Sequence, residues 1–212
     1  MSGINVVYVV GDSISLHYGP YLKQYLAGIA HYARKEAEEA AALHLDPPQD
    51  ANGGDSSMVR AFLSAKERTG GIRADLVLVN CGLHDIKTDP QTGARQVPLD
   101  AYRRNLQEIV AALRRMAVQP VWVRTTPCDE KVHNRPGIPF FRFSADVIRY
   151  NEAADEVMSD ARVPSIDLYT FTANLGGDLF CDHVHFRDNV RERQAAFIAG
   201  WIAAWAGKKG AP

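Results

Sequence analysis

The chain has 212 residues, a length that favours one domain with a sizeable hydrophobic core. Hydrophobic residues make up 46% of it and charged residues 23%, which is typical of a globular protein and excludes a fibrous or disordered one. The net charge of −1 gives no reason to expect nucleic acid or an anionic membrane as a partner. We therefore expect a single domain, residues 1–212, with neither of these partners.

The N-terminal residues carry no basic region before an apolar run of signal-peptide length. No segment approaches the ~18 consecutive apolar residues of a membrane helix. The three cysteines, Cys81, Cys128 and Cys181, are odd in number and lack metal-ligand spacing, which argues against a disulfide framework. These features predict a cytoplasmic protein without a bound metal or cofactor.

The first predicted element is a strand at 6–10, a continuous apolar run rich in valine. A β-branched run of this length is typical of a strand that is buried on both faces. Gly11-Asp12-Ser13 ends the run abruptly. A short helix at about 20–27, a weak strand at 29–34 and a helix at 36–43 are expected to follow.

Strand and helix patterns alternate along the rest of the chain. Asp55 or Ser56 is expected to cap the next helix, and Gly82 stops the second clear strand. Asp100 is the expected cap of a helix whose apolar residues recur at helical spacing. In chain order, the predicted elements are a helix ending near 68, a strand at 74–81, a helix from 100, a strand at 120–124, an irregular segment at 127–143, a helix at 144–161, a strand at 163–167 and a helix at 188–205.

This alternation predicts a mostly parallel five-stranded sheet with helices on both faces, a three-layer α/β/α sandwich. Ser13, Gly82 and Thr125 then lie at strand ends on one edge of the sheet, with the loops at 47–56, 82–98 and 127–143 beside them. In open α/β sheets, the carboxyl edge is where ligands bind.

Two residues near the other end of the chain, Asp182 and His185, suggest a chemical role for Ser13. A serine hydroxyl is a poor nucleophile until a base takes its proton, and histidine is the usual base because its pKa lies near working pH. A third group fixes the imidazole tautomer and stabilises the imidazolium. The spacing of Asp182 and His185 lets the carboxylate reach one ring nitrogen and leaves the other for Ser13. A catalytic triad is therefore predicted, without the Gly-x-Ser-x-Gly elbow of the α/β-hydrolases.

Four short blocks carry a resemblance to a known family. In chain order they are Gly11-Asp12-Ser13, Asn52-Gly53-Gly54-Asp55-Ser56, Gly82-Leu83-His84-Asp85 and Asp182-His183-Val184-His185. Together they resemble the blocks of the SGNH (GDSL-type) hydrolases, and the third is similar to a bacterial subgroup with Gly-Leu-His-Asp. The resemblance covers nearly the whole chain. It implies a flavodoxin-like sandwich with Ser13 as nucleophile, His185 as base and Asp182 as the residue that orients it.

The resemblance also implies an oxyanion hole, whose donors stabilise negative charge on the reacting carbonyl oxygen. The implied donors are the backbone N–H of Ser13, the N–H of Gly54 with Gly53 as the alternative, and a side chain of the third block. His84 stands where the family has asparagine. A neutral imidazole donates one N–H, in one tautomer only, so His84 is either the third donor or a substrate-contact or structural residue. Asp85 either holds the His84 ring or caps a helix.

Structural roles are expected for the other histidines and for Cys181. His183 is expected to point away from Ser13, and His17 and His133 to lie outside the site. Cys181 is expected to be a small buried residue.

The sequence thus predicts a serine esterase that hydrolyses short acyl esters, including O-acetyl esters of carbohydrates, through an acyl-enzyme on Ser13. Acyl transfer by the same triad is one alternative. A non-catalytic binding module, suggested by His84, is another. The third alternative is a metal-dependent hydrolase, with ligands drawn from His84, Asp85, Asp182, His183 and His185.

Overall fold

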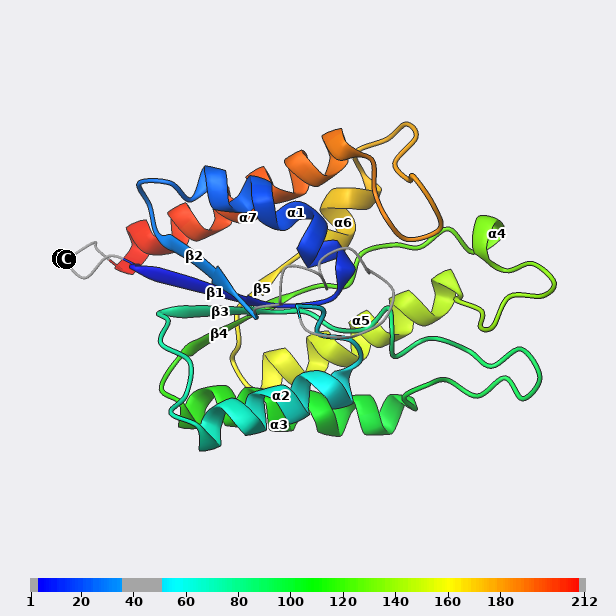
Figure 1. Ribbon diagram of the computed structural model, residues 1–212, viewed down its shortest axis with the longest axis horizontal. Helices are drawn as coiled ribbons and strands as arrows, with labels where there is room; N and C mark the ends of the chain where they lie inside the picture. The colour runs from blue at the N-terminus through cyan, green and yellow to red at the C-terminus, as the bar shows by residue number, and fades with distance from the viewer. Residues whose placement is uncertain (1–3, 36–50, 210–212) are drawn as a thin grey trace.

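Five strands form one parallel sheet in the computed structural model, which describes residues 4–35 and 51–209 (Figure 1). Their spatial order is β2 (His31–Arg34), β1 (Val6–Val10), β3 (Leu76–Val79), β4 (Gln119–Val123) and β5 (Ser165–Ile166). This order is that of flavodoxin-like doubly wound sheets. The predicted fold is confirmed, and all four strand pairs of these ranges are parallel. The helix predicted at 36–43 lies outside the described residues.

Helices cover both faces of the sheet (Figure 1). One face carries α1 (Ser13–Tyr25), α6 (Leu168–Ala173) and α7 (Asp188–Lys209), and the other carries α2 (Ser56–Arg68), α3 (Leu99–Arg115) and α5 (Ser144–Asp160). The short helix α4 (Glu130–His133) lies among the loops beyond the carboxyl ends of the strands. No helix within the described ranges is long and apolar enough to cross a membrane.

The central strands are buried because both of their faces are covered. Val7, Val9 and Val10 of β1 and every residue of β3 are at most 2% exposed. Strands in this position require apolar side chains on both faces, which explains why their sequences are continuous apolar runs rather than alternating ones.

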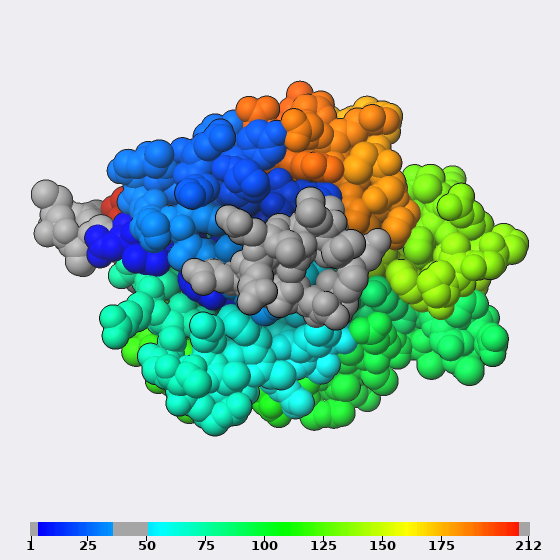
Figure 2. Space-filling view, viewed as in Figure 1, coloured from blue at the N-terminus to red at the C-terminus, as the bar shows by residue number. Residues whose placement is uncertain are grey.

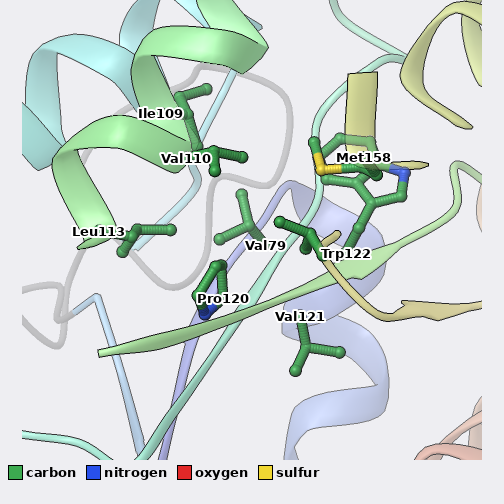
Figure 3. A pocket seen from close by; sticks show the side chains of 9 residues that line it. Val79, Ile109, Val110, Leu113, Pro120, Val121, Trp122 and Met158 are labelled. Atoms are coloured by element: carbon green, nitrogen blue, oxygen red, sulfur yellow. The ribbon is translucent and has the colours of Figure 1, made fainter. Parts of the chain in front are cut away.

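The core between α3 and the sheet is closely packed (Figure 3). Val110 and Leu113 of α3 face Val79 and Pro120 of the neighbouring strands, and the cavity among these side chains measures only about 10 Å³. A space of this size holds at most one water, and its apolar lining offers such a water no partners. This packing holds β3 and β4 in place and thereby positions the loops that leave their carboxyl ends.

Two helices begin at residues other than those predicted. α1 begins at Ser13 rather than near Pro20, because Asp12 caps it by accepting the N–H of Ile14 at 3.0 Å. α3 begins at Leu99, so Asp100 lies in its first turn and is not its cap. The carboxylate of Asp100 still interacts favourably with the positive end of the helix there. The helices α4 and α6 were not predicted.

Gly82 lies where the chain turns at the end of β3. Its φ is 153°, and a Cβ at this position would overlap the hydroxyl of Thr125. That hydroxyl donates to the carbonyl of Cys81 at 2.9 Å and holds the two strand ends together. The predicted convergence of Gly82 and Thr125 at one edge is therefore confirmed, and only glycine fits the contact.

We expect Gly82→Ala to lower the free energy of unfolding by about 2 to 3 kcal/mol, because it adds backbone strain and a steric overlap. Gly200 provides the control, since it is exposed within α7 and a Cβ there meets no atom within 4 Å. Gly200→Ala should stabilise the protein by about 0.5 to 1 kcal/mol. Urea unfolding of both variants tests this, and equal stability of Gly82→Ala and wild type would contradict the packing argument.

Candidate active site

Ser13 lies where β1 ends and α1 begins, at the carboxyl edge of the sheet. It is 5% exposed and is the first residue of α1. The N–H groups of the first helical turn have no intrahelical acceptor and form the positive end of the helix dipole. Ser13 therefore offers both its side-chain hydroxyl and its backbone N–H at this point.

Ser13, His185 and Asp182 form a continuous chain of hydrogen bonds. The Nε2 of His185 lies 2.8 Å from Oγ of Ser13, and its Nδ1 lies 2.6 Å from Oδ2 of Asp182. The serine comes from the start of α1, and the other two residues come from the turn that precedes α7. The structure thus brings together the three residues that the sequence pattern selected.

Asp182 is held as a carboxylate by its surroundings. Burial raises its pKa, but the ring of His185 and the backbone N–H groups of Val184 and His185 hydrogen-bond to it and together hold the pKa well below its usual range. Its Oδ1 accepts those two N–H groups at 2.8 and 2.7 Å. An ionised Asp182 accepts a proton on Nδ1 of His185, which leaves Nε2 of the ring facing Oγ of Ser13.

His84 is a neutral imidazole in this site. It is 4% exposed, and burial, reinforced by the positive charges of Lys87 and Arg142, lowers its pKa to about 3. Its Nδ1 is buried and has no hydrogen-bond partner. A buried ring nitrogen without a partner is costly, and a polar substrate group is one way to satisfy it.

The two candidate glycine donors already have acceptors inside the protein. Gly53 donates its N–H to the backbone carbonyl of Gly11 at 2.8 Å, and Gly54 donates to Oδ1 of Asn52 at 2.9 Å. The first bond joins two backbone segments of the site. The second ends on a side chain rather than on backbone, so Gly54 is the better of the two candidates.

Cations at the end of β2 hold this glycine loop beside α1, a link that sequence analysis missed. Arg34 donates to the carbonyls of Ser15 and Ala51, each at 3.1 Å. Lys35 donates from Nζ to the carbonyl of Asn52 at 3.0 Å. Arg34 is the last residue of β2 and Lys35 follows it. The sequence of this strand is only weakly apolar, so its place beside β1, and with it the position of these two cations, could not be predicted from the sequence.

Asp85 contacts the start of α2 in this structure. It is fully buried, and its two carboxyl oxygens lie 3.0 and 3.1 Å from the backbone nitrogen of Ser56, the first residue of α2. Of the two roles left open by the sequence, these contacts support the helix-terminal one. Burial raises the pKa of Asp85 to about 8. Asp85 thereby joins the turn that carries His84 to the loop that carries Gly54.

His17 lies against the candidate base, contrary to the expectation from sequence. Its ring centroid is 4.8 Å from that of His185. His17 follows Ser13 by four residues, and residues so spaced share one face of a helix. The signal was present but was lost because the helix was predicted to start near Pro20.

The other histidines occupy the far side of the Asp182 turn. His183 stacks on His133 with centroids 3.9 Å apart, and its Nε2 lies 2.8 Å from Nη1 of Arg142. The expectation that Cys181 is buried was wrong, since this residue is exposed.

Within residues 4–35 and 51–209, no group of three or more His, Cys, Asp or Glu side chains is arranged to hold a metal ion. Two of the five candidate ligands already contact other groups of the protein, since Asp85 contacts Ser56 and His183 contacts Arg142.

A flavodoxin-like sheet brings a serine, a histidine and an aspartate into contact at its carboxyl edge, an arrangement that can support acyl transfer through the serine. The family model of the GDSL-like lipase/acylhydrolase family matches residues 9–193, and the chain belongs to this family. It is therefore a carboxylic ester hydrolase, as the sequence predicted.

Solved structures share this fold at low sequence identity. A lipase/acylhydrolase from Enterococcus faecalis is 17% identical with a TM-score of 0.70, and the match covers 95% of this chain and 96% of that one. Est24, a carbohydrate acetylesterase from Sinorhizobium meliloti, is 16% identical with a TM-score of 0.62, and the match covers 95% of this chain and 99% of Est24. A catalytic mutant of Axe2, an acetylxylan esterase from Geobacillus stearothermophilus, is 13% identical with a TM-score of 0.68, over 95% of both chains. No curated protein matches the sequence.

The lowered pKa of His84 predicts a pH dependence of stability. Between pH 6.5 and about 3, the unfolded chain takes up a proton at His84 that the folded protein does not, so the free energy of unfolding falls as the pH drops through this window. The contribution of this residue is about 1.4 kcal/mol per pH unit. Urea unfolding at several pH values tests it with His84→Gln as the control. The variant should show a shallower slope, and identical slopes would contradict a neutral, buried His84.

Proposed function

We propose that the protein is a serine esterase that hydrolyses short acyl esters, with O-acetylated carbohydrates as its substrate class. The observation that carries this proposal is the chain of contacts from Oγ of Ser13 through both ring nitrogens of His185 to Asp182, at 2.8 and 2.6 Å. We also propose that residues 1–212 form one catalytic domain.

In the proposed reaction, Nε2 of His185 takes the hydroxyl proton as Oγ of Ser13 forms a bond to the ester carbonyl carbon. The carbonyl π electrons move onto oxygen and form a tetrahedral oxyanion. When this intermediate collapses, the bond to the alcohol breaks, and the imidazolium of His185 protonates the departing alkoxide. Water then attacks the acyl-enzyme by the same steps, which releases the acid and restores the proton to Ser13. Asp182 stabilises the imidazolium throughout.

Three donors are proposed for the oxyanion. The N–H of Ser13 lies at the positive end of α1, where a developing negative charge is stabilised. The N–H of Gly54 is the second proposed donor, and it would exchange its present acceptor, Oδ1 of Asn52, for the oxyanion. His84 supplies the third donor, because a neutral imidazole whose buried nitrogen has no partner donates without adding a charge beside His185.

The substrate class rests on similarity of fold. Both Est24 and Axe2 are described as esterases that act on acetylated carbohydrates or xylan, and each covers nearly the whole of this chain.

Ser13→Ala and His185→Ala should each lower kcat on an ester that the wild type hydrolyses by more than about 10⁴-fold, because each removes a reacting group. Asp182→Ala should leave more residual activity, because it removes the residue that orients the base. A panel of acyl esters and acetylated sugars, together with labelling of Ser13 by a serine-reactive phosphonate, provides the measurement. Wild-type turnover by Ser13→Ala would refute the mechanism.

Two substitutions at His84 separate an oxyanion donor from a spectator. His84→Ala removes the donor and should lower kcat by about 10²- to 10³-fold. His84→Asn restores an amide at this position and should stay much closer to wild type. The measurement is steady-state kinetics on the best ester of the panel. Unaltered kinetics in His84→Ala would rule out the donor role.

A further inference from the structure

Arg142 is a buried cation in the irregular segment at 127–143. It is only 4% exposed, and a guanidinium stays charged at any pH at which the protein is folded. A buried charge is costly unless its donors are hydrogen-bonded. Sequence analysis did not single out this residue, because nothing in a loop with several prolines and aromatic residues predicts a buried arginine.

The guanidinium joins two turns that lie far apart in the sequence. Its Nε donates to the carbonyl of Leu83, the residue before His84, at 2.8 Å. Its Nη1 lies 2.8 Å from Nε2 of His183, which stands between Asp182 and His185. The same side chain thus contacts two turns. One carries the proposed oxyanion donor, His84, and the other carries the proposed base, His185, and the carboxylate that orients it.

Arg142 is itself held at its backbone. Its N–H donates to Oδ1 of Asn134 at 2.9 Å, and its carbonyl accepts from Nδ2 of Asn134 at 2.6 Å. The guanidinium carbon lies 4.9 Å from the centre of the Phe140 ring. The neighbouring loop adds further support, because the backbones of Thr88 and Phe141 exchange two hydrogen bonds of 2.8 Å. The loops at 82–98 and 127–143 accordingly form one end of the molecule (Figure 2).

The contact with Arg142 determines the tautomer of His183. A guanidinium only donates, so Nε2 of His183 must accept, and the proton of the neutral ring is on Nδ1. That nitrogen lies 3.8 Å from Oδ1 of Asp182. This separation is too long for a hydrogen bond, and it places a ring nitrogen of His183 beside the carboxylate of Asp182. His133 stacks on the ring and restricts its rotation.

We propose that Arg142 is a positioning residue that clamps the His84 turn to the Asp182–His185 turn. The clamp sets the position of the oxyanion donor relative to the base, and it acts on Asp182 through His183. Its kinetic consequence rests on the proposed function, whereas the contact with His183 does not. Lysine cannot replace the clamp, because an ammonium does not present two N–H groups in one rigid plane.

Kinetics of Arg142→Gln and Arg142→Lys test the consequence for turnover. A small displacement of catalytic groups costs about 10²-fold in rate, so we expect kcat of both variants to fall by about 10- to 100-fold while KM changes by less than about threefold. Arg135 is exposed on the same segment, and Arg135→Gln is the matched control that should retain wild-type kinetics. A folded Arg142→Gln variant with kcat within about threefold of wild type would overturn the proposal.

Nitrogen-15 NMR of the histidines tests the clamp without any ester. In the wild type, we expect the signals of His183 to report a proton on Nδ1, with assignment from the signal lost in His183→Asn. A proton on Nε2 would overturn the clamp. This measurement tests the contact between Arg142 and His183 even if Arg142→Gln does not fold. If the phosphonate leaves Ser13 unlabelled and no ester is cleaved, the proposed function fails, while the tautomer of His183 still supports or refutes the contact with Arg142.

Discussion

The hydrogen bond between Oγ of Ser13 and Nε2 of His185 joins residues 172 positions apart, at 2.8 Å. The rest of the fold is arranged so that this contact forms. Because β1 runs directly into α1, Ser13 is held by a central strand on one side and a capped helix on the other. His185 arrives from the turn before α7, which packs beside α1 on the same face of the sheet (Figure 1). A parallel sheet makes this possible, since it directs every strand end, and the loop that follows it, to one edge.

The surroundings of the site keep Asp182 ionised and two neighbouring histidines neutral. Asp182 is an anion and has a hydrogen bond to His185, whereas burial keeps His84 and His17 neutral by lowering their pKa values to about 3 and about 4. A second imidazolium near His185 would oppose the positive charge that this residue acquires in the proposed reaction, when it takes the serine proton. His185 therefore differs from these neutral rings, because its two ring nitrogens contact both Asp182 and Ser13. This division of roles follows from the surroundings of each ring, since the side chains are chemically identical.

Most of the fold and the contact between Asp182 and His185 could be predicted from the sequence because their signals are local. A run of valines predicts a buried strand by itself, and the spacing of Asp182 and His185 predicts their contact within one turn. The contacts of His17 and Arg142 could not be predicted in the same way. The position of His17 depends on α1 starting at Ser13, which the capping contact of Asp12 determines. The partners of Arg142 lie 59 and 41 residues away, and no periodicity connects them.

A histidine at position 84 depends on its neighbours for its tautomer and its charge, whereas an asparagine would not. An amide presents N–H donors at every pH, whereas an imidazole is a suitable donor only in one tautomer and adds a competing charge when it is protonated. In this protein, burial and the cations Lys87 and Arg142 prevent that protonation. Arg142 also holds the carbonyl of Leu83, the residue next to His84, at 2.8 Å. One buried guanidinium thus contacts the turn of His84 and contributes to its low pKa, so the proposed use of a histidine as donor depends on the loop that supplies Arg142.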